Sequence, residues 1–220
     1  MSKKLTNQPA KSLVKRLLLL ITSLTFIAAM PAHAIDEPAY TVVQTTDVFE
    51  VRQYAPYLVA EVVVPGPVSE AGNQGFSLLG GYIFGKNKGE RKLEMTAPVM
   101  QSALPPAPPV KLEMTAPVTQ TAVAGGFLVQ FVMPKPYTLA TLPEPLDAQV
   151  KLREVPGSRI AVIRFSGSWS QSIYEEQLQI LRSALATAGM ATTGEPVSSR
   201  YNSPFSLPFL RRNEIWLNLV

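Results

Sequence analysis

The chain has 220 residues, of which 46% are hydrophobic and 16% are charged, a composition typical of one folded globular domain and not of a disordered or collagen-like chain. Its 20 basic and 16 acidic residues give a formal charge of +4, but five of the bases and none of the acids precede residue 35, which leaves 15 bases, 16 acids and a net charge of −1 for the rest. This near-neutral remainder argues against nucleic-acid binding.

The first 34 residues have the three parts of a secretory signal peptide. A basic start is followed by an apolar run of 14 residues, 17–30, and by Ala32 and Ala34, whose small side chains frame a cleavage site. The run is shorter than the roughly 20 residues that a membrane-spanning helix needs. We therefore expect cleavage between Ala34 and Ile35, no membrane span after cleavage, and export to the periplasm of a Gram-negative bacterium as a monomer in which residues 35–220 form one domain.

The chain has no cysteine, and its single histidine, His33, lies in the segment that we expect to be removed. The mature chain therefore has no disulfide, no thiolate nucleophile and no Ser-His-Asp triad, and it cannot bind zinc or haem iron through histidine. Its stability must come from packing alone.

The mature chain begins with three expected strands, which are joined by connections short enough for antiparallel hairpins and cover 40–45, 48–54 and 57–64. A helix is predicted over 68–83, because Phe76, Leu79, Tyr82 and Ile83 fall on one helical face. Four glycines inside this segment each weaken a helix by about 1 kcal/mol relative to alanine. We therefore expect a helix that depends on tertiary contacts.

The sequence Lys-Leu-Glu-Met-Thr-Ala-Pro-Val occurs twice, at 92–99 and at 111–118, with a period of 19 residues. A proline-rich loop at 101–110 lies between the copies and is expected to be extended, because proline fixes φ and lacks an amide donor. Two repeats are too few for a solenoid. The pattern indicates a local duplication in which one copy keeps the structural position and the other lies in an extended loop or edge strand.

The last third of the mature chain contains the clearest helix, predicted over 168–188. Tyr174, Leu178, Leu181 and Leu185 lie on one face, Ser170 can cap its start, and Gly189 follows its end. Strands are expected on both sides of this helix, at 127–133, 149–155, 159–166, 197–201 and 215–220. The order of strands and helices predicts a mostly antiparallel α+β domain.

Several separated blocks, in the right order along the mature chain, resemble the SOUL haem-binding protein family. They are Met-Thr-Ala-Pro-Val at 95–99 and 114–118, Phe-Val-Met-Pro at 131–134, Phe-Ser-Gly at 165–167, Tyr-Asn-Ser-Pro at 201–204, and Arg-Arg-Asn-Glu-Ile-Trp at 211–216. The resemblance implies a distorted, mostly antiparallel β-barrel with two α-helices, built as a pseudo-twofold repeat and similar to effector-binding domains of the GyrI-like type.

The resemblance also implies reversible, non-covalent binding of haem or another tetrapyrrole in an apolar groove beside the first helix. The positions that would contact such a ligand are apolar or methionine side chains together with cations for the propionates: Phe76, Leu79, Tyr82, Ile83, Met95, Met114, Met133, Lys86, Arg91 and Lys92. Two positions that look basic in other members are Asn73 and Gly81 here. Lys86, Lys88, Arg91 and Lys92 follow closely after the helix and could supply the cations instead. Without histidine or cysteine, an iron ligand would be one of the three methionines or Tyr82.

Each of these features also has a structural interpretation. The methionines and the helix face can simply fill the core, and one of Arg211 and Arg212 can be an internal ion-pair partner. Two alternative functions remain open beside haem binding. One is an envelope module for another hydrophobic small molecule, and the other is an enzyme using Glu94 or Glu113, which requires one of these carboxylates in a pocket beside a second polar group. We expect a binding protein without enzymatic activity and without a metal site of its own.

Overall fold

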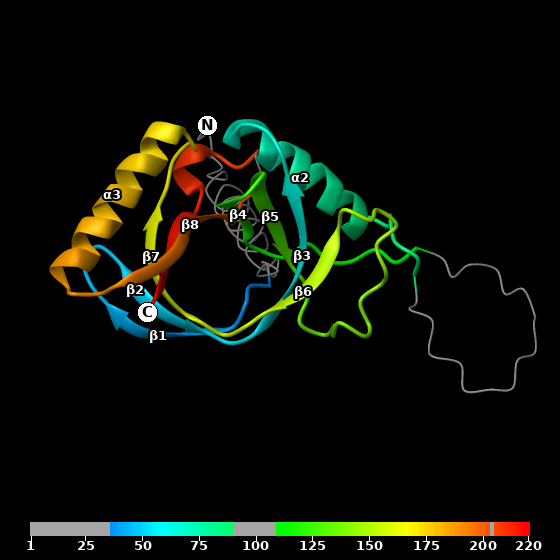
Figure 1. Cartoon of the computed structure of the whole chain (residues 1–220), viewed down its shortest axis with the longest axis horizontal. Helices are drawn as coiled ribbons and strands as arrows, with labels where there is room; N and C mark the ends of the chain where they lie inside the picture. Colours follow the sequence, from blue (N-terminus) through cyan, green and yellow to red (C-terminus); the bar gives the residue numbers. More distant parts are fainter. Residues whose placement is uncertain (1–35, 90–108, 203–204) are drawn as a thin grey trace, which may run out of the picture. The chain divides into compact units, whose positions relative to one another are not determined.

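A computed structural model describes residues 36–89, 109–202 and 205–220, and within them nine strands and two α-helices follow one another (Figure 1). Three strands come first, followed by helix α2: β1 (Tyr40–Thr45), β2 (Glu50–Tyr54), β3 (Tyr57–Val64) and α2 (Val68–Ile83). Four strands separate the two helices: β4 (Val118–Val123), β5 (Gly126–Val132), β6 (Lys151–Val155) and β7 (Arg159–Phe165). Helix α3 (Gln171–Thr187) then precedes β8 (Thr192–Arg200), a short 3-10 helix (Pro208–Leu210) and β9 (Asn213–Leu219).

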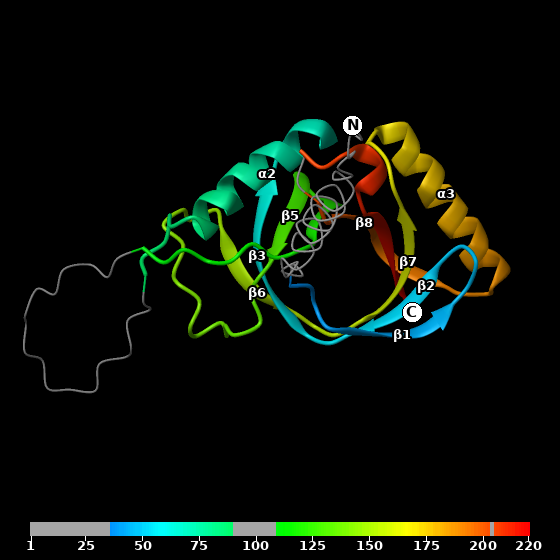
Figure 2. The ribbon, with the colours of Figure 1, turned by 180° about the vertical axis from the view of Figure 1, so that it is seen from behind.

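The nine strands form one sheet in the order β1-β2-β7-β9-β8-β4-β5-β3-β6, and every neighbouring pair is antiparallel. Figures 1 and 2 show this sheet curling into an open barrel with α2 and α3 on its outer side. The architecture confirms the α+β distorted barrel that the sequence predicts.

The sheet order also contains the expected pseudo-twofold repeat. The unit β3-α2-β4-β5 places its strands in the order β4-β5-β3, and the unit β7-α3-β8-β9 places its strands in the order β8-β9-β7. The two units meet where β4 pairs with β8. Helix α2 packs on β3 and β5, while α3 packs on β7 and β9, so the two helices lie on the same face of the curled sheet.

Each helix covers its own apolar cluster. The cluster under α2 includes Leu79, Tyr82, Val129 and Phe131, and the cluster under α3 includes Val51, Leu181, Leu185 and Ile215. A third cluster lies on the other face of the sheet, the inside of the curl, and contains these buried residues: Tyr54, Ala116, Ile160, Val162, Tyr201 and Trp216. Burial of all three clusters supplies the packing that a domain without disulfides needs.

Gly75 explains why a glycine-rich segment forms α2. A Cβ placed on Gly75 would lie 2.6 Å from the Cβ of Val129, so the helix backbone approaches β5 more closely than any other residue would allow. The cost of this glycine in helix propensity is therefore offset by close packing of the helix on the sheet.

The block at 211–216 supplies a buried ion pair. The Glu214 carboxylate accepts hydrogen bonds from Arg52 Nη1 at 3.0 Å, Arg212 Nε at 2.9 Å, Tyr201 Oη at 2.7 Å and Trp216 Nε1 at 2.8 Å. Arg212 also pairs with Glu37 at 2.8 Å. This confirms the structural interpretation of the arginine pair, since Arg212 is an internal ion-pair partner.

Two strands differ from their predictions, and two predicted segments lie outside the described residues. Strand β4 follows directly on the second copy of the repeat and was not predicted. Strand β8 begins at Thr192, five residues before the expected start, because a register shift between Thr193 and Val197 lets the pairing with β9 continue past Gly194 and Pro196. The first copy of the repeat, 92–99, and residues 101–108 of the proline-rich loop lie outside the described residues. Among the residues that are described, no helix is both long and apolar enough to cross a bilayer.

Candidate functional site

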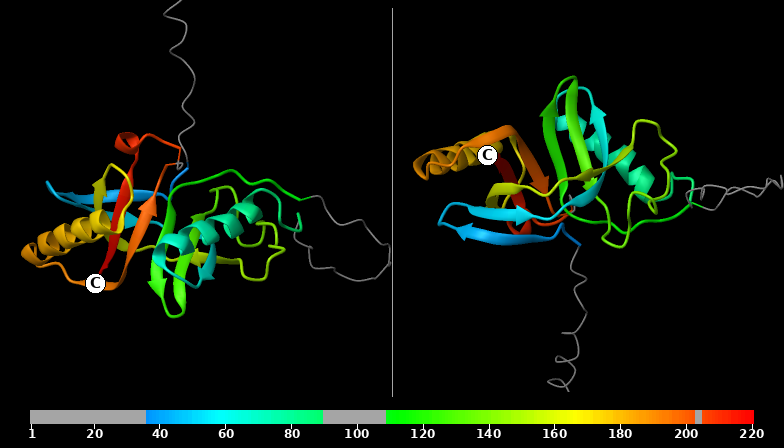
Figure 3. Two further views of the ribbon diagram at one scale, coloured as in Figure 1. Left: turned by 90° about the horizontal axis from the view of Figure 1, so that it is seen from above. Right: turned by 60° about the horizontal axis from the view of Figure 1, so that its bottom comes forward.

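An apolar groove of about 410 Å³ lies between the start of α2 and the length of α3. We call it the inter-helix groove. Its floor comes from β4 and β8, which meet at the junction of the two pseudo-symmetric units, and its walls come from the two helices. The lining residues are Pro67, Val68, Gln120, Ala122, Phe127, Trp169, Gln171, Tyr174, Leu178, Arg182, Glu195, Pro196 and Ser198. Figure 3 shows the two helices seen from above, with β8 and the β4–β5 hairpin between them.

The start of α3 builds an aromatic wall for the groove. Ser170 is the N-cap of α3, and its hydroxyl accepts a hydrogen bond from the Ile173 amide. Trp169 precedes the cap and Tyr174 is the fourth helical residue, and their rings lie 5.5 Å apart, which is the arrangement of a hydrophobic staple. Phe165 stacks on Trp169 at 6.0 Å. The N-cap and the hydrophobic staple at the start of the helix therefore also position the aromatic side chains that line the groove.

The groove wall continues along one face of α3, where the side chains change from apolar at the start of the helix to charged further along it. Tyr174, Leu178 and Arg182 are spaced four residues apart, so they lie on the same face of the helix. Arg182 and Glu195 are exposed and lie at the rim. Burial raises the pKa of Tyr174, against the opposing charge of Arg182, so its phenol stays neutral at neutral pH.

The polar groups in the floor of the groove are already bonded within the protein. The Gln120 side-chain amide donates to the Val68 carbonyl at 3.1 Å, and the Ser198 hydroxyl donates to the Gln120 carbonyl at 3.3 Å. The floor therefore offers mainly apolar surface to a ligand. This groove can hold a flat hydrophobic molecule with a negative group near Arg182.

The structure places the predicted ligand contacts in three different settings. Leu79, Tyr82, Ile83 and Met133 are buried in the core under α2, and the Tyr82 hydroxyl donates to the Pro143 carbonyl at 2.9 Å. Phe76, Lys86 and Met114 are exposed, and none of them lines the inter-helix groove. The remaining three, Met95, Arg91 and Lys92, lie outside the described residues, so their role stays a prediction.

A second apolar surface lies on α2 itself. Phe76 and Phe84 are 41% and 57% exposed, and Gly80 between them leaves a gap, since a Cβ there would lie 3.9 Å from Phe76 and 4.0 Å from Phe84. Lys111 Nζ lies 5.8 Å from the centre of the Phe84 ring. We call Phe76, Gly80 and Phe84 the α2 stripe. Of the predicted ligand contacts it contains only Phe76, which is exposed, as are Lys86 and Met114.

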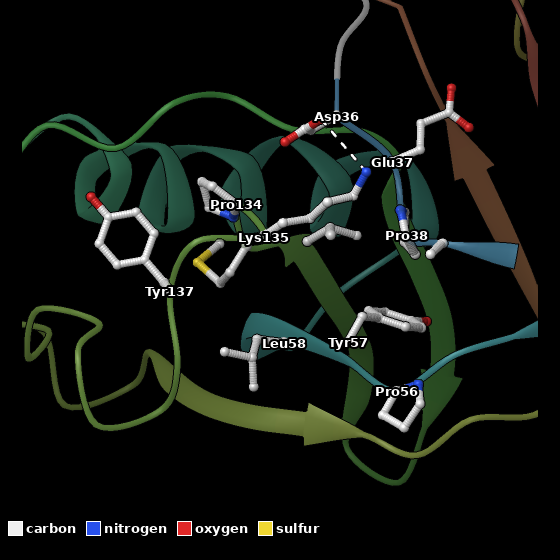
Figure 4. Close-up of a pocket in the computed structure, with 12 residues that line it drawn as sticks. Asp36, Glu37, Pro38, Pro56, Tyr57, Leu58, Pro134, Lys135 and Tyr137 are labelled. Atoms are coloured by element: carbon white, nitrogen blue, oxygen red, sulfur yellow. Dashed lines mark ion pairs between the residues drawn. The ribbon is translucent and has the colours of Figure 1, made fainter.

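A smaller cleft of about 180 Å³ lies where the first described residues cross the sheet (Figure 4). Its lining includes Tyr57, Met133 and Tyr137, and Lys135 reaches toward Asp36 with 3.8 Å between Nζ and Oδ1. Burial raises the pKa of Tyr57. The cleft is below the roughly 300 Å³ at which ligand pockets begin, so it is too small for a tetrapyrrole.

Sequence reasoning missed the main lining of the inter-helix groove, Trp169 above all. The signal was present, because a tryptophan directly before a serine N-cap and five residues before a tyrosine is the pattern of a staple. The spacing of Tyr174 and Leu178 served only to predict the helix.

The chain is similar to known proteins over most of its length. The family model described as SOUL heme-binding protein matches residues 35–218. Two curated relatives are similar to the chain, Heme-binding protein 2 of Mus musculus at 28% identity and Heme-binding protein 2 of Homo sapiens at 29% identity. Each match extends over 171 residues, which are 77% of this chain and 77% of the relative.

Among solved structures, the EcmrR C-terminal domain has a similar fold. It superimposes with a TM-score of 0.51 at 11% identity, over 82% of this chain and 98% of that chain. A structure described as a hydrolase from Listeria innocua also has a TM-score of 0.51, at 12% identity, over 81% of this chain and 94% of that chain. At such identities the likeness shows the fold alone.

Proposed function

The chain belongs to the SOUL heme-binding protein family, and on this premise we propose that it is an exported, non-enzymatic protein that binds haem or a related tetrapyrrole without a covalent bond. The family and its named relatives support non-covalent haem binding. The observation that carries the proposal in this chain is the inter-helix groove with its aromatic wall.

The groove matches the chemistry of a tetrapyrrole. Its volume of about 410 Å³ lies in the range of ligand pockets, and the aromatic residues Phe127, Trp169 and Tyr174 line it. The Arg200 guanidinium lies over the Trp169 ring at 4.5 Å. Haem also has two carboxylates, for which Arg182 at the rim is a suitable partner. We therefore assign the ring to the groove and the propionates to its α3 side.

The ligand is bound by contact and not by histidine or cysteine. From Ile35 onward the chain contains neither residue. Among the described residues no methionine lines the groove, and burial raises the pKa of its tyrosine, Tyr174, which disfavours the phenolate form that would bind iron. Apolar contact and propionate recognition then supply the affinity, so iron contributes little to it.

We place the protein in the periplasm, after cleavage between Ala34 and Ile35. The segment that would follow the cleavage site is hydrogen-bonded to the domain. The Asp36 carbonyl accepts a hydrogen bond from the Ala116 amide at 3.0 Å. Glu37 pairs with Arg212 at 2.8 Å. The proposed cut therefore falls one residue before Asp36, which is bonded to the domain.

The alternative functions differ in what they require of the structure. A module for another hydrophobic small molecule would use the same groove, and only the ligand would change. An enzyme using Glu113 would need that carboxylate in a pocket, whereas Glu113 is exposed and lines neither the inter-helix groove nor the cleft of Figure 4. Glu94, the other candidate, lies outside the described residues.

Blocking the groove tests its assignment. Ala122 is exposed on the groove floor, while Ala124 is exposed in the β4–β5 turn and does not line the groove. We expect Ala122→Trp to weaken haemin binding by about tenfold or more and Ala124→Trp to leave it unchanged. Unchanged binding in both variants, with weaker binding in Phe76→Ser, would move the ligand to the α2 stripe and refute the groove assignment.

A further inference from the structure

The turn that joins β8 to β9 exposes four large apolar side chains within six residues. Phe205 is 96% exposed, Leu207 55%, Phe209 70% and Leu210 65%. We call Phe205–Leu210 the apolar turn. Exposed apolar side chains are common one at a time, but a contiguous group of this kind marks an interaction surface.

Hydrogen bonds hold the apolar turn in one conformation. The Leu210 amide donates to the Leu207 carbonyl at 2.9 Å, and Arg211 Nε donates to the Ser206 carbonyl at 2.8 Å. The Gly167 amide donates to the Pro208 carbonyl at 2.9 Å, which ties the turn to the segment that leads into α3. The side chains are therefore presented outward from a fixed backbone, and Figure 3 shows the turn beyond the ends of β8 and β9.

The surroundings of the apolar turn are basic. Segments 164–174 and 200–213 contain four arginines and no aspartate or glutamate. Arg212 pairs with Glu37 and Glu214, and the Arg200 guanidinium lies over the Trp169 ring at 4.5 Å. Arg164 and Arg211 line a cleft together with Phe209 and Leu210. Arg164 is exposed and takes part in no ion pair within the described part of the chain, and the neighbouring Glu214 is buried and bonded to Arg52 and Arg212. Arg164 and Arg211 therefore supply the positive charge beside the apolar turn.

We propose that the apolar turn docks the protein on an anionic phospholipid bilayer. Phe205, Leu207 and Phe209 enter the boundary between headgroups and acyl chains, and the Arg164 and Arg211 guanidiniums bind lipid phosphates. Apolar side chains beside cations are the combination that binds such surfaces. The exposed, outward-facing turn fits a deformable bilayer, and its charge is complementary to anionic lipids.

Docking in this way brings the inter-helix groove near the lipid. The Gly167–Pro208 bond places the apolar turn against the chain two residues before Trp169, which forms the aromatic wall of the groove. A hydrophobic ligand dissolved in the membrane would then have a short path to its binding site.

Vesicle co-sedimentation tests the proposal on protein expressed from Ile35, since all described strands, helices and core clusters come from residues after it. The probes are vesicles of phosphatidylcholine with and without phosphatidylglycerol. We expect the protein to bind the phosphatidylglycerol vesicles, and we expect this binding to weaken as salt is added. The affinity should fall about tenfold or more in the double variant Phe205→Ser/Phe209→Ser, and it should also fall in Arg164→Gln. Leu146→Ser and Arg153→Gln change an exposed apolar and an exposed basic residue elsewhere and should bind as the unmodified protein does.

Two results would overturn the proposal. One is vesicle binding that is absent, or equal in the double variant and the unmodified protein. The other is a concentration-dependent dimer in sedimentation equilibrium that the double variant abolishes, since the apolar turn would then be an interface between two copies of the chain. Haemin titration of the double variant should match that of the unmodified protein, so failure of membrane docking is distinguishable from failure of ligand binding.

Discussion

Arg52 and Glu214 form an ion pair in the interior of the curled sheet, with 3.0 Å between Nη1 and Oε2 and side chains that are 3% and 0% exposed. The pair connects β2 to β9 across the intervening strand β7. Tyr201, Arg212 and Trp216 supply further hydrogen bonds to the same carboxylate. Nearly all of its acceptor positions are therefore used within the protein, and the pair acts in the fold and not in ligand binding.

Loss of Arg52 should be much more costly than loss of an exposed arginine in a similar pair. Removing one partner of a buried ion pair costs about 3–5 kcal/mol when the other charge is left without compensation. Arg212 still pairs with Glu214 but is shared with Glu37, so the loss of Arg52 should cost roughly the lower end of that range. Arg153 pairs with Glu61 at 3.0 Å on the sheet but is 45% exposed, so its loss should cost about 1 kcal/mol or less. Urea unfolding of Arg52→Met and Arg153→Met measures both effects. Equal destabilisation would contradict the role assigned to the buried pair.

The stability of the protein should fall on acidification through Glu214. Burial by itself would raise the pKa of this carboxyl, but the charge and hydrogen bonds of Arg52, with those of Trp216 and Tyr201, hold the pKa below its usual value. A carboxyl with a lower pKa in the folded state stabilises the protein above the unfolded-state pKa of about 4.3 and loses that contribution as pH falls through the folded-state pKa.

We expect the free energy of unfolding to decrease from about pH 5 downward, and to decrease less steeply in Glu214→Gln, which is already destabilised at neutral pH. Urea unfolding of both proteins across this range gives the comparison. The same slope in both would show that other carboxyls control acid unfolding.

Substitution of two glycines of α2 by alanine should change the stability of the protein in opposite directions. At Gly75 the new methyl group would lie 2.6 Å from Val129, and such overpacking costs about 1–3 kcal/mol against a gain of about 1 kcal/mol in helix propensity. At Gly80 the nearest atoms lie at 3.9 Å, which is ordinary contact, so Gly80→Ala should gain up to about 1 kcal/mol. Thermal unfolding of both variants measures the difference. Stabilisation by Gly75→Ala would mean that α2 can move away from β5 at little cost.

Much of the fold was predictable because the local sequence signals, such as apolar periodicity and helix capping residues, agree with the way the elements pack. The bounds of α2 match the predicted 68–83, and the predicted Ser170 cap of α3 is present. Strand β4 was not predicted because Thr119, Gln120 and Thr121 are all polar and lack the apolar–polar alternation that indicates a half-buried strand. The early start of β8 was missed because Gly194 and Pro196 normally end strands, and only pairing with β9 overrides them.

The candidate site was less predictable, because it lies between two units that are distant in sequence. Val68, Ala122 and Trp169 come together only when β4 pairs with β8 and both helices lie on one face of the sheet. Periodicity identified the apolar faces of the helices but not which apolar residues remain open to solvent. Leu79 and Ile83 became core, while Phe76 on the same helix stayed exposed.

Arg182 should strengthen binding of the ligand through its carboxylates and not through its ring. Because its side chain is exposed at the rim of the groove, we expect Arg182→Gln to weaken haemin binding by roughly two- to fivefold. Binding of the dimethyl ester of the same porphyrin, which lacks the negative charges, should not change. Arg159→Gln, which alters an exposed arginine outside the groove, is the matched control. An equal loss for the acid and the ester would show that Arg182 acts through packing.

The central claim is that this chain binds a tetrapyrrole by contact within the inter-helix groove. The most direct measurement is titration of the protein from Ile35 to Val220 with haemin, followed at the Soret band, beside the same titration with the iron-free porphyrin. The account predicts saturation at one ligand per chain with a dissociation constant of about 1 μM or below for both rings. Failure of haemin to saturate, or saturable binding of haemin with none of the iron-free ring, would contradict it.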